Sequence, residues 1–288
     1  MRMLTQVEGV VLSVAVYPDS KKLAACDGRR TIRILDLQTG RELGRRENLP
    51  SPMDKLVVSP DGRRIVAVDR SGKVFAWDAE DLVPLVESAS RECLPAMLGR
   101  ATKVWGDSCR VVTRGGVEIS TDDGGGKVCA KWPNQGPGVV LLDQGQPECI
   151  YFAISDDGRH TAVMVNNCSF EPASLVYVFE TEHLLCAPGW EDREDLYSEA
   201  IDSCGEDGNV QEMIFSPDHQ RLAIRLWKGN GVTIWDFQKG EAKGYSEQEW
   251  YSHAITAFAF LGNEKMIVGT ESGEIEVWDL RTSTQNAS

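Results

Sequence analysis

Several short stretches of this 288-residue chain combine residue types that can do chemistry, yet each fits a simpler structural role. Gly269-Thr-Glu-Ser-Gly273 resembles a nucleophile turn, but its serine stands one place late, which is typical of a hairpin turn. Gly124-Gly-Gly-Lys127 lacks the spacing of a phosphate-binding loop and the Ser or Thr that should follow the lysine. We therefore predict no catalytic residues, no cofactor-binding residues and no enzyme activity.

Metal binding is the next chemistry to weigh, and the chain has four histidines, His160, His183, His219 and His253. His160 and His219 fall at predicted turns, at the opposite end of the expected strands from His253. A zinc site needs its ligands to converge on one point. We therefore expect no shared metal site.

The segment 187–209 is the most distinctive part of the chain. Between residues 191 and 207 it carries eight carboxylates and one arginine, with aromatic and apolar residues interleaved. One interpretation is a solvated loop. The other is a docking segment for a basic partner, because aromatic residues are enriched at binding hot spots. The predicted partner-binding residues are Trp190, Glu191, Asp192, Glu194, Asp195, Tyr197, Trp250, Tyr251, His253, Arg70 and Lys228.

The elements that must position these residues are short strands. Residues 55–78 hold three apolar runs separated by the turn signals Ser59-Pro-Asp-Gly62 and Asp69-Arg-Ser-Gly72. Pro presets one turn torsion and Gly accepts positive φ. Three β-branched or aromatic runs separated by tight turns predict an antiparallel meander.

The same pattern returns along the chain. Similar units cover residues 14–37, 150–179, 213–236 and 257–279. Trp77-Asp78, Trp235-Asp236 and Trp278-Asp279 close three units, and Leu35-Asp36 closes the first. This resembles the WD-repeat family, whose units end in Trp-Asp and recur at about 40–45 residues. We expect the three tryptophans to pack between units, as anchors of the fold.

The resemblance has departures. The family's Gly-His dipeptide is absent, and Ser71, Gly229 and Ser272 stand where the family places an Asp, six residues before the closing Trp. A buried His–Asp network, which stiffens many members of the family, is therefore not expected here.

The resemblance implies an all-β fold, a closed β-propeller of four-stranded antiparallel blades. First strands near residues 14, 54, 102, 150, 211 and 256 predict six blades, although seven is commoner in the family. A segment from residues 2–8 would complete the last blade and close the ring, which removes exposed strand edges. Segment by segment, the single domain 1–288 comprises blade 1 with the closing strand (3–49), blade 2 (50–91), a degenerate blade 3 (92–145), blade 4 (146–186), the acidic insertion (187–209), blade 5 (210–250), blade 6 (251–282) and a polar tail (283–288).

Two blades carry specific expectations. In blade 2, residues 82–86 should form the outer strand, where Pro84 is tolerated because outer strands are edges. In blade 3 the strands fall near 102–105, 110–113, 117–120 and 127–132. An alternative register makes residues 126–132 the third strand, and residues 139–142 form an extra strand in either case. The sequence leaves both registers open.

Composition excludes some classes of partner. A net charge of −14 and a pI near 4.8 argue against nucleic acid and against anionic membrane surfaces. Eight cysteines without a Cys-x-x-Cys pair are typical of buried free thiols. The apolar stretch 10–16 follows Glu8 and leads into a turn, so we interpret it as a strand and not as a targeting segment. We expect an intracellular protein, cytoplasmic or nuclear.

From the resemblance we expect a non-enzymatic scaffold that binds a protein or peptide on one face of the ring. The alternative is a small-molecule or catalytic site in the central channel. A third possibility is that the propeller belongs to a longer, multidomain protein. The sequence does not specify the partner or the oligomeric state.

Overall fold

A computed structural model describes residues 1–71, 73–85 and 254–281 as continuous stretches. In the middle of the chain it describes residues 102–104, 110–112, 118–121, 127–131, 139–143, 149–155, 160–167, 173–180, 185–186, 210–226, 231–236 and 241–246. These residues form strands and turns only, and all the strand pairings are antiparallel. The predicted all-β class of small antiparallel sheets is confirmed. No helix in this described part is long and apolar enough to cross a membrane.

The chain divides into two compact units. Unit 1 comprises Met1–Leu98 with Glu249–Ser288, and unit 2 comprises Gly99–Gln248.

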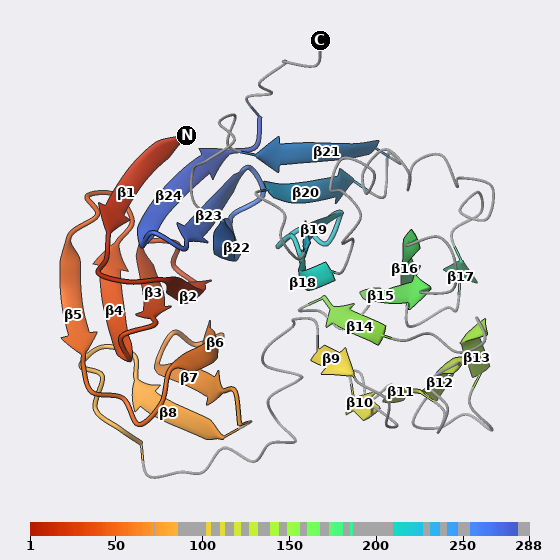
Figure 1. Ribbon diagram of the computed structural model, residues 1–288, viewed down its shortest axis with the longest axis horizontal. Coiled ribbons are helices and arrows are strands. Elements are labelled where there is room, and N and C mark those ends of the chain that lie inside the picture. Colours follow the sequence, from red (N-terminus) through yellow and green to blue (C-terminus); the bar gives the residue numbers. More distant parts are fainter. Residues whose placement is uncertain are drawn as a thin grey trace. The chain divides into compact units, whose positions relative to one another are not determined.

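Unit 1 contains three sheets among its described residues (Figure 1). Sheet A has the order β1-β24-β23-β22, sheet B the order β2-β3-β4-β5, and sheet C the order β6-β7-β8. Their bounds are β1 Arg2–Gln6, β2 Val11–Val16, β3 Lys22–Asp27, β4 Thr31–Asp36, β5 Glu42–Arg46, β6 Met53–Val58, β7 Arg64–Asp69, β8 Val74–Asp78, β22 Ile255–Leu261, β23 Lys265–Thr270 and β24 Glu274–Asp279.

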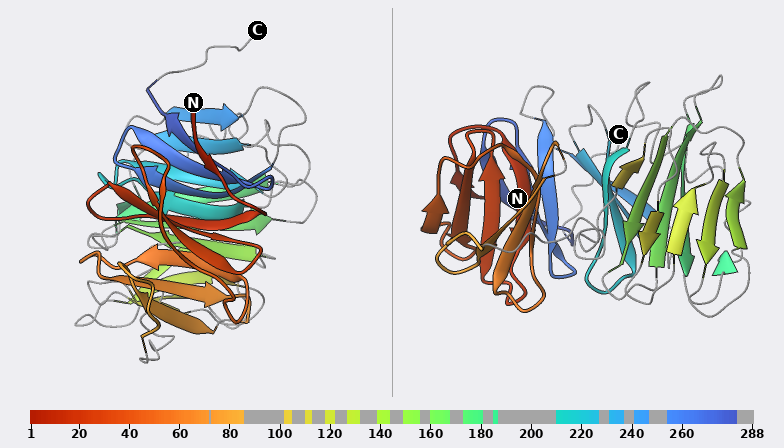
Figure 2. Two further views of the ribbon diagram at one scale, coloured as in Figure 1. Left: turned by 90° about the vertical axis from the view of Figure 1, so that its left-hand side faces the viewer. Right: turned by 90° about the horizontal axis from the view of Figure 1, so that it is seen from below.

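Unit 2 also contains three sheets, with the orders β10-β11-β12-β13, β17-β16-β15-β14-β9 and β18-β19-β20-β21. Their bounds are β9 Thr102–Val104, β10 Arg110–Val112, β11 Glu118–Thr121, β12 Lys127–Lys131, β13 Val139–Asp143, β14 Cys149–Ile154, β15 His160–Asn167, β16 Ala173–Glu180, β17 Leu185–Cys186, β18 Val210–Phe215, β19 Arg221–Leu226, β20 Gly231–Asp236 and β21 Glu241–Ser246. Figure 2 shows the strands and their connecting turns from two further sides.

The second strands of the meanders in sheets A and B are buried on both faces, which explains their continuous apolar runs, whereas β1 and β5 are largely exposed. β3 is buried from Leu23 to Asp27, and β23 from Met266 to Thr270. One core, which includes Ile34, Met53 and Trp77, lies between sheets B and C. A second core, which includes Val14, lies between sheets A and B. Each sheet therefore gains its apolar contacts from its neighbours, as expected of a repeat that cannot bury its faces alone.

The N-terminal strand completes the sheet formed by the end of the chain. β1 pairs antiparallel with β24, with Arg2 opposite Val277 and Gln6 opposite Glu274. The pairing continues where the Val7 N–H donates to the Gly273 carbonyl at 2.8 Å. Gly273 has φ +91°, and a Cβ there would stand 2.2 Å from the Val7 carbonyl oxygen, so only glycine fits. The predicted pairing of the N-terminal segment with the last repeat is confirmed.

Hydrogen bonds also join the neighbouring sheets of unit 1. The Thr256 hydroxyl on β22 donates to the Val11 carbonyl on β2 at 2.6 Å. The Leu56 N–H on β6 donates to the Ser13 hydroxyl on β2 at 3.1 Å. The first bond joins the starts of β22 and β2.

Cys26 lies at the end of β3, beside the start of β2, and its thiol donates to the carbonyl of Met53, the first residue of β6, at 3.4 Å; β22, β2 and β6 therefore begin at the same end of unit 1. At the other end of sheets B and C, the buried Tyr17 hydroxyl donates to the Ala79 carbonyl at 2.6 Å.

The predicted outer strand of blade 2 is only partly formed. The described residues show a single bridge between Trp77 and Pro84, flanked by hydrogen bonds from Asp78 N–H to the Val83 carbonyl and from Leu85 N–H to the Ala76 carbonyl, both 2.9 Å. In this bridge Pro84 occupies the non-hydrogen-bonded position, so the N–H that proline lacks would face away from β8, and proline is tolerated there. Val86 lies outside the described residues.

In the third repeat, the alternative register is the one observed. β12 is the third strand of its sheet, between β11 and β13, and the extra strand near residue 139 is its fourth. The expectation that residues 102–105 start this sheet is wrong, because β9 pairs with β14 of the next sheet, Ile150 opposite Val104. With β10–β13 already paired, β9 instead protects the open edge of β14.

The tryptophans differ in burial. Trp77 and Trp278 are 3% and 5% exposed, as expected of anchors, and the Trp278 Nε1–H donates to Glu276 at 2.7 Å. Trp235 is only partly buried.

Candidate functional site

Most of the predicted partner-binding residues lie outside the described part of the chain. Arg70 is described; it follows β7 and its side chain is 82% exposed. The residues outside are Trp190, Glu191, Asp192, Glu194, Asp195, Tyr197, Lys228, Trp250, Tyr251 and His253. The structure therefore brings Arg70 together with none of them, and the predicted patch stays a prediction.

Arg70 belongs to a surface that recurs in all three sheets of unit 1. In each sheet a tight turn joins the second and third strands of the meander: residues 28–30 in sheet B, 70–73 in sheet C and 271–273 in sheet A. Each turn lies beside the start of the first strand of its meander, because Asp27 pairs with Val11 and Asp69 pairs with Met53. Since those first strands begin at the same end of unit 1, the three turns share one face, which we call the hairpin face.

A side chain at the end of the second strand caps each of these turns. In sheet B, Asp27 Oδ1 accepts hydrogen bonds from the N–H groups of Arg29 and Thr31 at 3.0 and 3.1 Å. In sheet C, Asp69 Oδ1 accepts from the N–H groups of Ser71 and Lys73, both at 2.9 Å.

Sheet A uses a hydroxyl in the same place. There the Thr270 hydroxyl accepts from the Glu274 N–H at 3.1 Å. The three caps fix backbone groups that would otherwise be unpaired in the turn.

The serines that depart from the family pattern take part in these caps. Ser71 donates its hydroxyl to Asp69 Oδ1 at 2.6 Å, and Ser51 donates to Asp69 Oδ2 at 2.7 Å. Together with the backbone donors, these hydroxyls lower the pKa of Asp69 to about 2. Ser272 lies 2.8 Å from the Thr270 hydroxyl. The turns are thus held by local Asp and Ser contacts in place of a His–Asp network.

The exposed side chains on the hairpin face are charged. Arg29 forms an ion pair with Glu8, and their side chains are 65% and 77% exposed. Arg70 lies 3.9 Å from Asp54. Exposed pairs of this kind contribute little to stability. Their guanidinium and carboxylate groups therefore remain accessible to a partner while the turns beneath them stay fixed.

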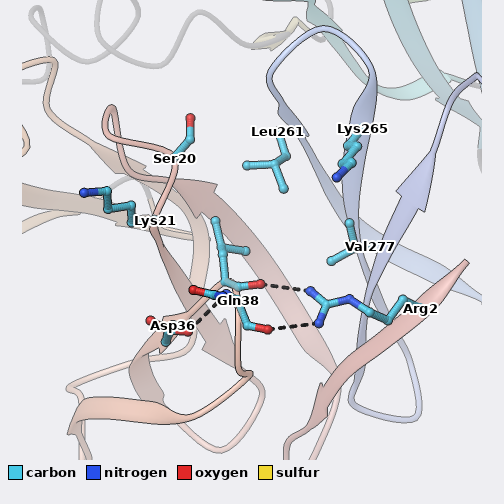
Figure 3. A pocket seen from close by; sticks show the side chains of 9 residues that line it. Arg2, Ser20, Lys21, Asp36, Gln38, Leu261, Lys265 and Val277 are labelled. Carbon is cyan, nitrogen blue, oxygen red and sulfur yellow. Dashed lines mark hydrogen bonds between the residues drawn. The ribbon is translucent and has the colours of Figure 1, made fainter.

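A pocket of about 530 Å³ lies at the opposite end of the strands, between sheets A and B (Figure 3). We call it the basic pocket. Its lining comes from the start of β1, the turns β2–β3 and β22–β23, and the ends of β4 and β24. The lining residues are Arg2, Ser20, Lys21, Asp36, Leu37, Gln38, Leu261, Lys265 and Val277.

Arg2 crosses from sheet A to sheet B in this pocket. Its two terminal nitrogens donate to the carbonyl oxygens of Leu37 at 2.9 Å and Gln38 at 3.1 Å (Figure 3). The nearby carboxylate, Asp36, is engaged in its own turn. Its Oδ1 accepts from the Thr39 hydroxyl and the Thr39 N–H, both 2.7 Å, and from the Gln38 N–H at 3.0 Å. The Thr39 hydrogen bonds lower the pKa of Asp36, so it is ionised at neutral pH.

The lining of the basic pocket holds one carboxylate and one serine and no histidine or cysteine, so it offers no nucleophile paired with a base. Elsewhere in the described residues, the rings of His160 and His219 lie 6.3 Å apart. No group of three or more possible metal ligands occurs in that described part.

A scan against protein-family models and a search of curated proteins return no match to this chain. Function therefore has to be inferred from the residues themselves.

Two features of these surfaces were missed by reasoning from the sequence. The caps could have been found from the sequence, because Asp27 and Asp69 each end an apolar run, with three or four residues between the Asp and the next strand. The basic pocket carries no comparable signal, because its cations, Arg2, Lys21 and Lys265, are far apart in the chain.

Proposed function

We propose that the chain is a closed β-propeller of the WD-repeat type that acts as a non-enzymatic scaffold and binds a protein or peptide on one face of the ring. Three features support the ring. Similar meanders recur along the chain, three of them end in Trp-Asp, and β1 pairs with the last described strand. In such a fold the N-terminal strand joins the first and last repeats and leaves no open sheet between them.

The proposed binding role rests mainly on one observation, the capped turn that recurs in each sheet of the hairpin face. Three neighbouring sheets present the same fixed turn at the same end, and the exposed residues on those turns differ from sheet to sheet: Arg29 and Arg30, Arg70, and Glu271. A rigid scaffold with variable exposed residues is suited to recognition, because little conformational entropy is lost when a partner binds.

The charges indicate the kind of partner. Arg29 and Arg70 stand beside Glu8 and Asp54, so this face offers alternating signs and not one uniform field. Such a pattern favours a partner with complementary charges, and it confers specificity more than affinity. The acidic segment 187–209, if it joins the same face, would add the predicted preference for a basic partner.

The test is affinity capture from a lysate of the source cells with three forms of the full chain: wild type, Arg29→Glu/Arg70→Glu, and the control Arg41→Glu/Arg63→Glu. The control changes two exposed arginines that lie on neither the hairpin face nor the lining of the basic pocket. Proteins captured by wild type and the control should be depleted from the hairpin-face variant. Their direct binding is then measured with purified partner.

Equal capture by all three forms would refute the hairpin face as the binding site. The channel alternative is tested in parallel by a thermal shift screen against metabolites. A stabilising metabolite together with no captured protein would favour a small-molecule function over the scaffold.

A further inference from the structure

The basic pocket concentrates positive charge on a strongly acidic chain. Its lining carries three cations, Arg2, Lys21 and Lys265, against the single carboxylate of Asp36. The whole chain, in contrast, has a net charge of −14. The local excess is therefore not a consequence of overall composition.

Lys265 lies opposite Asp279 in the pairing of β23 with β24, but Asp279 forms its ion pair with Arg281, at 2.8 Å. Within the described part of the chain, neither Lys21 nor Lys265 forms an ion pair or a side-chain hydrogen bond, and both side chains are exposed. Asp36, the one carboxylate of the lining, directs Oδ1 into three hydrogen bonds of its own turn. Positive charge at the pocket therefore remains available to an anionic ligand.

Arg2 differs from the lysines because its position is fixed. Two carbonyl oxygens hold its terminal nitrogens, so the guanidinium sits at the pocket without a carboxylate partner. Figure 3 shows Lys265 on the same side of the pocket as Arg2, whereas the amino end of Lys21, on sheet B, points away from the space between the sheets. An anionic group that enters from solvent therefore meets Arg2 and Lys265.

The interior of the pocket is apolar. Leu37 and Val277 are 6% and 8% exposed, and Leu261 is partly buried. Leu261 and Val277 point into the space between the sheets (Figure 3). Apolar side chains beneath a charged rim suit a ligand that has both an anionic and an apolar group.

We propose that the basic pocket binds an acidic peptide segment of a partner, with an Asp or Glu carboxylate between Arg2 and Lys265 and an adjacent apolar side chain against Leu37, Leu261 and Val277. The volume of about 530 Å³ accommodates a few side chains, and the rim residues are exposed, so a segment of a longer chain can enter. Nucleic acid is disfavoured by the net charge of −14. This site is separate from the hairpin face and does not depend on the function proposed for that face.

The test uses the purified full chain and an immobilised positional-scanning library of hexapeptides. Binding should select Asp or Glu at one position and an apolar residue beside it. The selected peptide is then synthesised with a fluorescein label, and its affinity is measured by anisotropy for wild type, Lys265→Gln and the matched control Lys21→Gln. Loss of one exposed ion pair should weaken binding about threefold, and the control should bind like wild type.

Two further arms separate the contributions. A peptide with Asn or Gln in place of the acidic residue should bind wild type no more tightly than the acidic peptide binds the Lys265→Gln variant. A peptide with Ser in place of the apolar residue should also bind wild type more weakly. Inorganic phosphate should compete only weakly, because it lacks an apolar group. Circular dichroism of each variant checks that it is folded.

The proposal is overturned if the library shows no preference for acidic residues, or if the Lys265→Gln variant binds the selected peptide as tightly as wild type. Competition by phosphate as strong as that by the unlabelled peptide would overturn the peptide assignment and leave a simple anion site.

Discussion

Replacement of Gly40 by Ala should detach the N-terminal strand β1 from the turn that contains Gly40. The same replacement at Gly262 provides a matched control. Gly40 has φ +72°, and a Cβ built there stands 2.1 Å from the Leu4 carbonyl oxygen on β1. Gly262 has a similar φ of +62°, but a Cβ there meets nothing within 4 Å. Both substitutions place an L residue in the left-handed region, and only one also forces atoms together.

The magnitudes follow from this difference. The left-handed conformation costs an L residue about 1–2 kcal/mol, which is the whole effect expected for Gly262→Ala. For Gly40→Ala, contacts below 3.0 Å essentially never occur, so either β1 or the turn must move. The movement breaks the Arg2 hydrogen bonds to Leu37 and Gln38, at about 0.5–1.5 kcal/mol each, and exposes part of Leu4. We expect Gly40→Ala to lose about 3–5 kcal/mol in total.

Urea denaturation followed by tryptophan fluorescence gives the stability of the two variants, and hydrogen exchange over residues 1–7 shows whether β1 has detached. Gly40→Ala should unfold at clearly lower urea and lose protection in β1, whereas Gly262→Ala should keep that protection. Equal midpoints, or full protection of β1 in Gly40→Ala, would refute the tight contact between the turn and the N-terminal strand.

Two further predictions concern sheet packing and acid stability. Tyr17→Phe removes the buried hydrogen bond to the Ala79 carbonyl and should destabilise unit 1 by about 1–2 kcal/mol in urea titration; a loss below the error of the titration would contradict it. Acid should destabilise the fold between about pH 4 and pH 2. The pKa of Asp69 is lowered to about 2 by Ser71 and Ser51, so its stabilising effect is complete above its unfolded pKa and is lost as pH falls through the folded value. Thermal melts should show a shallower acid decline for Asp69→Asn than for wild type, and parallel declines would contradict the role of Asp69.

Local patterns predicted much of the fold. Apolar runs such as β8, and turn signals such as Ser59-Pro-Asp-Gly62, fix strands and turns through residues close together in sequence. The structure bears this out, since the Ser59 hydroxyl donates to Asp61 at 2.5 Å and accepts from the Arg64 N–H at 2.9 Å. The pairing of β1 with β24 was predicted as well, because the last repeat lacks a strand of its own.

Contacts between distant residues were not predictable in this way. β9 has three residues, and its choice of β14 over β10 depends on which sheet edge remains open. The basic pocket depends on Arg2 and Lys265, which are far apart in sequence and which only the pairing of β1 with β24 brings together. Arg70 was named from the sequence, but the hydrogen bond from Ser51 to Asp69 beside it joins residues 18 apart and becomes evident only in the structure.

The most direct test of the proposed closed ring is small-angle X-ray scattering of the full chain in solution. One compact body of 288 residues should have a radius of gyration of about 19 Å. Two separate globules of half that size, in contact only at one point, should give about 24 Å and a distance distribution with two maxima. A value near 19 Å with a single maximum supports one propeller, and a two-lobed distribution near 24 Å or above contradicts it.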